Sequence, residues 1–309
     1  LNKGPEWSYE TDGNIESIAV SVDGEYLVAG SYDGDIYLWD KDSNTPLWNY
    51  ATGNNGYMTI EISTSGEYIV AGTWSPNARL YVWNKDNSTP LWTYTNSQGA
   101  ILSVAIASDG EYIVIGTGDN KVRLFDKDNS TPIWSYTGAS DVRSVDISAD
   151  GEYIVAGGSG STTDNGKIYV FDKYSSTPLW SYSAGNYVDA VAISADGEYM
   201  VAGSDDYKVY LFDKDSSTPL WTYDVGTHGV VELAMSADGE YIAAAGGSND
   251  KVFLWDKDSS TPLWSYETSG YVYDVDISAD GEYIVAGSGF GDTDAVYLFG
   301  RDSNTPLWS

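Results

Sequence analysis

The feature that most constrains this chain is a repeat that occurs seven times. Two short phrases mark it, Gly-Glu-Tyr and Thr-Pro-Leu/Ile-Trp, and they keep a fixed phase to each other. The first phrase begins at Gly24, Gly66, Gly110, Gly151, Gly197, Gly239 and Gly281, and the second at Thr45, Thr89, Thr131, Thr177, Thr218, Thr261 and Thr305. Repetition at about 42 residues predicts a chain built entirely from one supersecondary element.

Each repeat is predicted to form four short strands. In the last full repeat, residues 272–277 alternate apolar and polar side chains, and residues 282–287 form a short apolar run. A third strand covers 295–299, and a fourth opens at 307–308 after a proline, which cannot donate to a sheet ladder. Gly, Asp, Asn and Ser fill the turns between them. Four strands in about 42 residues are typical of a propeller blade.

The sequence therefore predicts an all-β protein, a seven-bladed β-propeller of four-stranded antiparallel blades. Residues 1–309 are expected to form a single domain with the first strands around a central channel. Helical repeats of similar length are excluded, because no repeat holds an uninterrupted run of 3.6-residue period.

Eight segments compete for seven fourth-strand positions. Residues 5–9 (PEWSY) repeat the Pro-Leu-Trp-Ser-Tyr phrase, and residues 306–309 begin it once more at the other end. We expect the N-terminal copy to close the last blade, with the other copy free to pair with a neighbouring protomer or domain. The first residue is Leu1, so the chain is expected to be processed or excised from a longer polypeptide.

Composition limits the partners. The chain has 46 acidic and 15 basic residues, a net charge of −31, which repels phosphate backbones, so nucleic-acid binding is not expected. No apolar run reaches the roughly 20 residues that span a bilayer, so direct membrane insertion is not expected either. Cysteine is absent, which excludes disulfides and thiol chemistry. Such a surface suits high salt, or an exported protein that must stay soluble.

Two family resemblances follow from the third strands. Leu38-Trp39-Asp40 and Leu254-Trp255-Asp256, with the Ser-x-Asp-Gly turns, resemble WD repeats, although the single histidine, His228, leaves most repeats without the histidine of that family. The phrase from Val209 to Trp221 resembles the repeat of quinoprotein-type propellers, which use pyrroloquinoline quinone (PQQ). These resemblances imply an archaeal cell-surface protein.

The quinoprotein resemblance implies a role for the recurring tryptophan, which would dock each blade on its neighbour. The residues that it assigns are Trp48, Trp92, Trp134, Trp180, Trp221, Trp264 and Trp308. The resemblance does not extend to the cofactor, because PQQ enzymes carry inserted ligands, catalytic acids and basic residues that we do not find. No cofactor is expected.

Two acidic patterns are candidate cation ligands. Asp40-Lys41-Asp42-Ser43-Asn44 begins like a calcium loop, but threonine follows where glycine is needed, which favours side chains capping a turn. Glu61, Asp146 and Asp276 occupy comparable positions of first strands and would face the channel, where they could hold a cation. Solvation by channel water, or pairing with Arg143, is the favoured alternative.

The variable loops hold the candidate partner-binding residues. Turns between strands one and two, and between strands three and four, are nearly uniform, whereas the other two sets differ in every repeat. Alternate connections lie on opposite faces of a propeller, so one face is expected to be uniform and the other variable, and recognition is expected on the variable one. Its candidates are Tyr57, Trp74, Arg79, Tyr187, His228, Tyr271 and Phe290. Unconstrained drift between the repeats explains the same variation.

These patterns predict a non-enzymatic protein-interaction or structural module of an exported, cell-surface protein or extracellular assembly. Its partners would be proteins, or further copies joined through the terminal strands. A glycan-binding propeller is the alternative, because exposed Tyr and Trp rings can stack on sugars. A PQQ-type dehydrogenase is the third interpretation, which the missing ligands disfavour.

Overall fold

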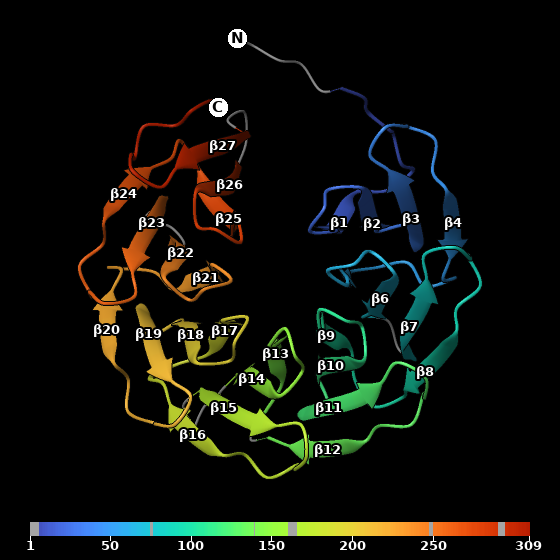
Figure 1. Ribbon diagram of the computed structural model, residues 1–309, viewed down its shortest axis with the longest axis horizontal. Helices are drawn as coiled ribbons and strands as arrows, with labels where there is room; N and C mark the ends of the chain where they lie inside the picture. Colours follow the sequence, from blue (N-terminus) through green and yellow to red (C-terminus); the bar gives the residue numbers. More distant parts are fainter. Residues whose placement is uncertain (1–5, 75–76, 139, 160–165, 247–249, 290–293) are drawn as a thin grey trace. The chain divides into compact units, whose positions relative to one another are not determined.

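The computed structural model describes residues 6–74, 77–138, 140–159, 166–246, 250–289 and 294–309. Throughout these residues the chain folds into β-strands and turns, without a helix, and the strands form seven antiparallel sheets in chain order (Figure 1). The predicted class, a seven-bladed β-propeller, is confirmed. Six sheets have four strands, and in the seventh the fourth strand is reduced to one bridge, Leu298 to Trp308. No helix suited to crossing a membrane occurs among the described residues.

The chain divides into two compact units, Leu1–Ser135 and Tyr136–Ser309. Compact unit 1 holds three blades, and β12 spans the boundary. The strands of blade 1 are β1 (Ile15–Val20), β2 (Tyr26–Ser31), β3 (Asp35–Asp40) and β4 (Trp48–Ala51); those of blade 2 are β5 (Met58–Ile62), β6 (Tyr68–Thr73), β7 (Ala78–Asn84) and β8 (Trp92–Asn96); those of blade 3 are β9 (Ile101–Ile106), β10 (Tyr112–Thr117), β11 (Lys121–Asp126) and β12 (Trp134–Thr137).

Compact unit 2 holds four blades. The strands of blade 4 are β13 (Val142–Ile147), β14 (Tyr153–Gly158), β15 (Lys167–Asp172) and β16 (Trp180–Ser183), and those of blade 5 are β17 (Val188–Ile193), β18 (Tyr199–Ser204), β19 (Lys208–Asp213) and β20 (Trp221–Asp224). The strands of blade 6 are β21 (Val230–Met235), β22 (Tyr241–Gly246), β23 (Lys251–Asp256) and β24 (Trp264–Glu267), and those of blade 7 are β25 (Tyr271–Ile277), β26 (Tyr283–Gly289) and β27 (Ala295–Gly300).

Within each compact unit, the first strands of successive blades pack against one another (Figure 1). The second and third strands are buried on both faces, because neighbouring blades cover them, and they carry most of the core. This explains why the second strands lack a polar face and read as apolar runs such as Tyr153–Gly158.

A β-bulge recurs in the first strand of most blades. The register against the second strand shifts between Val142 and Ser144 in blade 4, and between Val188 and Ala190 in blade 5. The extra residues are therefore Arg143 and Asp189. Bulges re-aim side chains at the ends of strands, and these two face each other across the blades.

In blades 1, 2, 4, 5 and 6, the tryptophan that opens the fourth strand joins its blade to the next. Trp180 donates its indole N–H to the backbone carbonyl of Lys214 at 2.6 Å, and its ring centroid lies 5.2 Å from that of Phe212. Trp48, Trp92, Trp221 and Trp264 make the same hydrogen bond to Lys85, Lys127, Lys257 and Arg301. These indoles are half-buried and cover fully buried aromatic rings of third strands.

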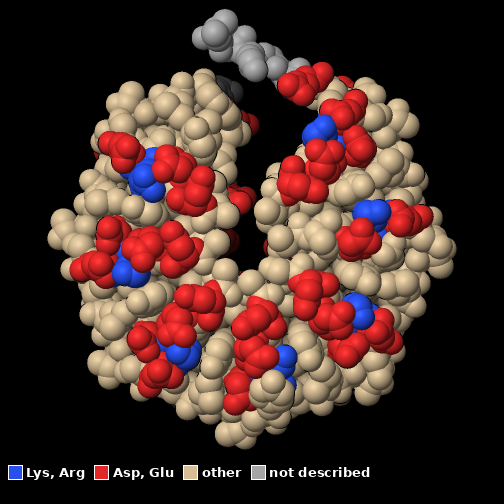
Figure 2. Space-filling model, in the orientation of Figure 1, with Lys and Arg blue, Asp and Glu red and all other residues tan. Residues whose placement is uncertain are grey.

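The Gly-Glu-Tyr phrase completes the same contact. The ammonium of Lys214 pairs with Glu198 of its own blade at 2.5 Å and lies 6.0 Å from the ring centre of Tyr153 in the preceding blade. That ring packs so close to Gly197 that an added Cβ would lie 2.6 Å from it, and Gly197 also has φ of 73°. Both facts require glycine at this turn. Figure 2 shows the resulting surface, with basic side chains set among acidic ones on successive blades.

The two terminal copies of the fourth-strand phrase are placed differently. Trp7 donates its indole N–H to the carbonyl of Lys41 at 2.6 Å, which is the docking contact of a preceding blade, although residues 6–9 form no strand. At the other end, Trp308 pairs with Leu298 of β27 and stays 54% exposed. Of the competing segments 5–9 and 306–309, Pro5 lies outside the described residues.

Candidate functional site

Three aromatic side chains gather on the variable loops of compact unit 1. Tyr32 and Trp74 each directly follow the second strand of their blade, and Tyr57 precedes β5. The ring centroids of Tyr57 and Trp74 are 5.1 Å apart, and those of Tyr32 and Tyr57 are 5.7 Å apart at 89°. Their exposed fractions are 46%, 55% and 45% for Tyr32, Tyr57 and Trp74. We call these three residues the aromatic trio.

Backbone hydrogen bonds hold the loops that carry the aromatic trio. The N–H of Trp74 donates to the carbonyl of Tyr57 at 3.1 Å, and the N–H of Gly56 donates to the carbonyl of Tyr32 at 2.8 Å. Gly56 has φ of 137°, which favours glycine at this turn. The rings therefore project from a cross-linked pair of loops and are preorganised. Among solvent-exposed side chains, an apolar cluster of this kind often marks a binding surface.

Tyr32 is the member of the aromatic trio that the sequence did not predict. It follows β2 as Trp74 follows β6, so the same rule, an aromatic residue at the start of a variable loop, would have found it. Arg79 lies in β7 of the same blade as Trp74, with its N–H donated to Thr73 Oγ1 at 3.0 Å. Burial raises the pKa of Tyr81, and the nearby Arg79 guanidinium opposes that rise.

A second group of candidates meets in compact unit 2. The guanidinium of Arg143 pairs with Asp189 at 2.5 Å and lies 4.7 Å from the centre of the Tyr187 ring. The carboxyl of Asp205 lies beside Asp189; burial and this neighbouring negative charge raise its pKa. Tyr187 thus belongs to a charged cluster, and the partner of Arg143 seen here is Asp189.

The remaining described candidates also lie in compact unit 2. The ring of Tyr271 packs against that of Tyr273, with centroids 4.8 Å apart and planes tilted by 53°, and burial raises the pKa of Tyr271. His228 is exposed, and its Nδ1 lies 3.2 Å from Thr227 Oγ1. Phe290 lies outside the described residues. Of the sequence candidates, Tyr57 and Trp74 come together in compact unit 1, and Tyr187 belongs to the charged cluster of compact unit 2.

The first-strand acids bind backbone amides. Asp146 accepts the N–H of Ile147 at 2.8 Å and that of Ile193, in the next blade, at 2.9 Å, while burial raises its pKa to about 6. Asp276 accepts the N–H of Ile277 at 2.7 Å. Glu61 lies in compact unit 1, half-buried. In the described part of the chain, no three His, Cys, Asp or Glu side chains are grouped closely enough to hold a metal ion.

Glu232 is a further acid that the sequence did not single out. It lies on β21, where the comparable residues of β1 and β13 are Ser17 and Ser144. Burial, and then the negative charge of Asp274, raise its pKa to about 8, so this carboxyl holds its proton at neutral pH.

An anionic quinone does not fit these residues. Glu232, Asp274 and Asp276 face the same region of compact unit 2, and each has a raised pKa, mainly through burial. The guanidinium of Arg143 is already paired with Asp189. PQQ itself carries carboxylates, and the first strands of this unit offer it no cluster of basic side chains.

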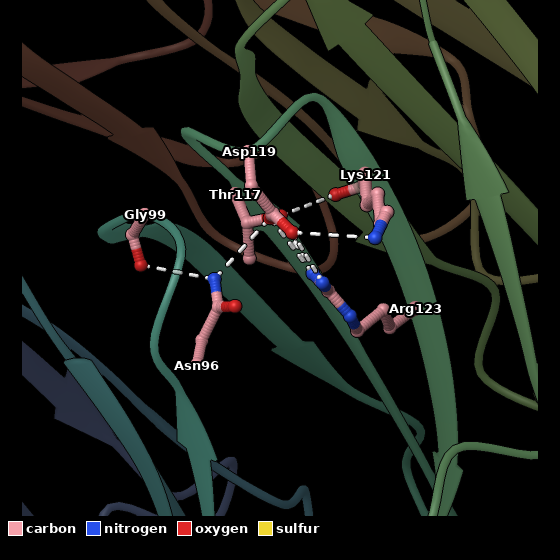
Figure 3. Close-up of polar contacts among 6 residues, drawn as sticks. All are labelled: Asn96, Gly99, Thr117, Asp119, Lys121 and Arg123. Carbon is pink, nitrogen blue, oxygen red and sulfur yellow. Dashed lines mark hydrogen bonds and ion pairs between the residues drawn. The ribbon is translucent and has the colours of Figure 1, made fainter. Parts of the chain in front are cut away.

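A buried ion pair on the variable side of blade 3 is structural (Figure 3). Asp119 accepts hydrogen bonds from Arg123 at 2.5 and 3.0 Å, from Thr117 at 2.5 Å and from Asn96 at 3.2 Å, and Lys121 lies 3.6 Å away. Both side chains of the Asp119–Arg123 pair are about 5% exposed. Burial raises the pKa of Asp119, but the hydrogen bonds from Arg123 and Thr117 outweigh this effect and hold the pKa well below its usual range.

The other blades explain why this pair exists. At the position of Arg123 they carry aromatic residues: Tyr37, Tyr81, Tyr169, Tyr210, Phe253 and Tyr297. In blade 5, Asp206 accepts a hydrogen bond from the Tyr210 hydroxyl, just as Asp119 accepts those of Arg123. The ion pair of blade 3 therefore takes the place of the Tyr210–Asp206 contact of blade 5.

Repeated blades joined by tryptophan-to-carbonyl contacts define a β-propeller of tryptophan-docked repeats. The chain belongs to the family whose model is described as outer membrane protein assembly factor BamB; the model matches residues 5–159 and, in a second match, residues 147–278. This confirms the resemblance to the PQQ-like repeat. A search of curated proteins found no match.

Proposed function

We propose that this chain is a non-enzymatic interaction module of an exported, cell-surface protein or extracellular assembly, and that it binds a protein partner through the variable face. The observation that carries the proposal is the aromatic trio, three exposed rings on loops cross-linked by backbone hydrogen bonds. Preorganised aromatic side chains are the residues that dominate protein–protein affinity. The matching family model is described as an assembly factor, which supports a binding role.

The two faces have different roles, one in interblade contacts and the other in variable loops, and this difference supports the assignment. Residues of the repeated phrases hold the blades together, as Trp180, Lys214 and Tyr153 do. The described residues of the other face's loops take no part in those contacts, so their side chains can differ from blade to blade. Such variation on a rigid scaffold is typical of recognition surfaces.

The test compares matched aromatic substitutions. Trp74→Ala and Tyr57→Ala remove members of the aromatic trio, and Tyr174→Ala removes a 76% exposed tyrosine that follows β15 on the uniform face. A partner is first isolated on the immobilised parent and identified, then purified and titrated against each variant. We expect Trp74→Ala to weaken binding at least about tenfold and Tyr174→Ala to leave it unchanged. The reverse result would place the interface on the uniform face.

The proposed cell-surface location is checked independently. In intact source cells, an external protease should cleave the protein, while a cytoplasmic marker stays whole. The net charge of −31 supports this setting, because it keeps an exported protein soluble. Cleavage only after the cells are broken would show that the protein is internal.

Glycan binding is the second candidate, and the aromatic trio favours it too. A sugar ring could stack on the Trp74 face while Tyr57 and Tyr32 border it. A glycan array distinguishes the two ligand classes. Binding to a defined glycan that is lost in Trp74→Ala and kept in Tyr174→Ala would favour the lectin-like function; an array without signal, together with a protein partner, favours the first proposal.

The non-enzymatic part of the proposal has its own assay. The chain is incubated with PQQ and Ca²⁺, and reduction of an artificial dye is followed with alcohols and sugars as substrates. We expect no dye reduction above that of the protein-free control, because acids rather than basic groups gather on the first strands of compact unit 2. Substrate-dependent reduction would show that the chain is a dehydrogenase.

A further inference from the structure

The turn between the third and fourth strands carries a modification motif in two neighbouring blades. Blade 2 has Asn87-Ser88-Thr89 there, and blade 3 has Asn129-Ser130-Thr131. Asparagine with serine or threonine two residues later, and any residue but proline between them, is the acceptor motif for N-linked glycosylation. Both motifs occupy the same position of the repeat, and both lie in compact unit 1.

The corresponding turns of the other blades lack the motif. Blades 4, 5 and 6 have serine in place of this asparagine, at Ser175, Ser216 and Ser259. Blades 1 and 7 have asparagine one residue later, at Asn44 and Asn304, where the second residue that follows is proline and carries no hydroxyl. The chain therefore contains the same turn with and without the motif, which gives matched controls.

Both motifs are accessible. Asn87, Thr89, Asn129 and Thr131 are all exposed, although the third strands that precede them are buried. The hydroxyl groups of the two threonines make no hydrogen bond within the part of the chain that the structure describes. An oligosaccharide attached to either asparagine would therefore extend into solvent.

A hydrogen bond orients each asparagine side chain. Oδ1 of Asn87 accepts the backbone N–H of Thr89 at 2.8 Å, and Oδ1 of Asn129 accepts that of Thr131 at 2.9 Å. Nδ2, the atom that would carry the sugar, makes no hydrogen bond to any described residue. Because each contact joins residues only two apart, it can form in the nascent chain as well as in the folded protein. The turn thus holds the asparagine beside the threonine that the motif requires.

We propose that Asn87 and Asn129 are N-glycosylated, each with an oligosaccharide on Nδ2. The inference rests on the proposed cell-surface location, because acceptor motifs of this kind are used in surface loops of secreted proteins. It goes beyond the proposed binding function, since the two turns lie on the uniform face and the aromatic trio lies on the variable loops. The glycans would therefore leave the aromatic trio open to a partner.

The transfer needs an oligosaccharide linked to a polyprenyl phosphate or diphosphate, and a transferase that binds it. The amide nitrogen attacks the anomeric carbon, so that a C–N bond forms and the C–O bond to phosphate breaks. The lipid phosphate leaves with the bonding electron pair, and Nδ2 gives up one proton to a carboxylate base of the transferase. The reaction needs no oxidant or reductant.

The fold tolerates the modification. Oδ1 remains a carbonyl oxygen after Nδ2 has been glycosylated, so both turn hydrogen bonds are kept. The neighbouring interblade joint uses a backbone atom, since the carbonyl of Lys85 accepts the indole N–H of Trp48 at 2.7 Å. A glycan on Asn87 would cover this part of the uniform face without replacing any contact that holds the blades together.

The direct test is mass spectrometry of the protein purified from its source cells. Trypsin cuts after lysine and arginine and therefore separates the two motifs, in peptides 86–121 and 128–143. We expect each peptide to be heavier than its amino-acid sequence by the mass of an oligosaccharide. Fragmentation should place the sugar on Asn87 in the first peptide and on Asn129 in the second.

The other blades supply a negative control and a gain of modification. Peptides 42–79 and 302–309, whose turn asparagines are followed by Thr-Pro, should keep their unmodified masses. Ser216→Asn completes the motif in blade 5, because Ser217 and Thr218 are already in place. This variant should gain a third glycan in source cells.

Two positions in blade 2 separate the motif from the turn. Thr89→Ala removes the hydroxyl but keeps the N–H that Asn87 binds, so it should abolish the glycan at Asn87, whereas Thr89→Ser should keep it. Asn87→Ser should remove the glycan and leave the turn intact, because Ser216 Oγ accepts the N–H of Thr218 at 3.1 Å in blade 5. Equal melting temperatures of the unglycosylated proteins, made in a host that lacks the transferase, check that these variants fold.

Unmodified peptides 86–121 and 128–143 overturn the inference. If external protease still cleaves the protein in intact cells, the proposed location stands and only the glycan assignment fails; if protease does not cleave it, both fail. A sugar that remains in peptide 86–121 of Thr89→Ala or Asn87→Ser would also overturn the assignment, because that sugar would not depend on the motif.

Discussion

Individual residues show how one structural position can be filled by different chemistry. Arg123 takes the place of an aromatic residue, and its charge is tolerated only because Asp119 and Thr117 bind it in a nearly closed site. Removing one partner of a buried ion pair lowers the stability of the fold far more than replacing both, because it leaves the other charge buried without a partner.

Asp119→Asn should therefore destabilise the fold by about 3–5 kcal/mol. The double variant Asp119→Asn with Arg123→Tyr should recover most of that loss, because tyrosine restores the side chain that most blades use. Urea unfolding of the three proteins measures the difference. A double variant no more stable than Asp119→Asn would show that the pair is not interchangeable with the aromatic residue.

The protonation of Glu232 makes stability depend on pH in a definite direction. Its folded pKa, about 8, lies above the ordinary value of 4.5, so the folded state keeps a proton that the unfolded chain releases. The stabilisation is complete below about pH 4.5 and is lost as the pH rises through 8. Glu232→Gln should match the parent in melting temperature near pH 5 and exceed it near pH 9. Parallel pH profiles for the two proteins would contradict the assignment.

At the level of elements, the fourth strand and the turn after the third strand form the joint between blades. Trp180 contributes a half-buried ring, a 2.6 Å hydrogen bond and contact with Phe212, whereas Trp74 is 45% exposed on a loop. The two tryptophans therefore differ in what their removal exposes.

Trp180→Ala should cost on the order of 3 kcal/mol, the lower part of the range for a large core side chain. Trp180→Phe keeps the ring and loses the hydrogen bond, so it should cost about 1 kcal/mol. Trp74→Ala should change the melting temperature very little. Thermal unfolding followed by circular dichroism gives the melting temperatures of the three variants. Equal losses of stability in Trp74→Ala and Trp180→Ala would refute the docking role of Trp180.

The repeated phrases were enough to predict the strands, the blades and the docking phrase, because each depends on residues close in sequence. Contacts between side chains of different blades could not be predicted from these phrases. Arg143 meets Asp189, 46 residues away, only because both strands carry a bulge, and bulges leave no distinct signal in an alternating pattern. The raised pKa of Glu232 likewise depends on Asp274 in another blade.

For the whole molecule, charge is the dominant long-range term. Acidic residues outnumber basic ones 46 to 15, so there are too few basic side chains to pair with every carboxylate, even though docking lysines such as Lys257 have two acids beside them. Repulsion among like charges opposes a compact state, and salt screens it over about 10 Å or less.

Raising NaCl from about 0.02 to 0.5 M should therefore raise the melting temperature by several degrees, because relief of repulsion outweighs weaker surface pairs worth about 0–1 kcal/mol each. KCl should act equally, since the effect depends on ionic strength. A melting temperature that falls with salt would show that the ion pairs of the uniform face outweigh the repulsion.

The interblade joint also bears on how such a gene changes with time. At each joint from blade 4 to blade 7, one blade supplies a tryptophan and the blade that follows supplies a lysine or arginine carbonyl. Duplication or loss of one coding segment of about 42 residues would therefore leave every surviving joint with the same chemistry, since each repeat depends on its immediate neighbours. The number of blades and the sequence of the loops can thus evolve independently. Recombination between near-identical coding segments changes the number of blades, and point substitution changes the loops.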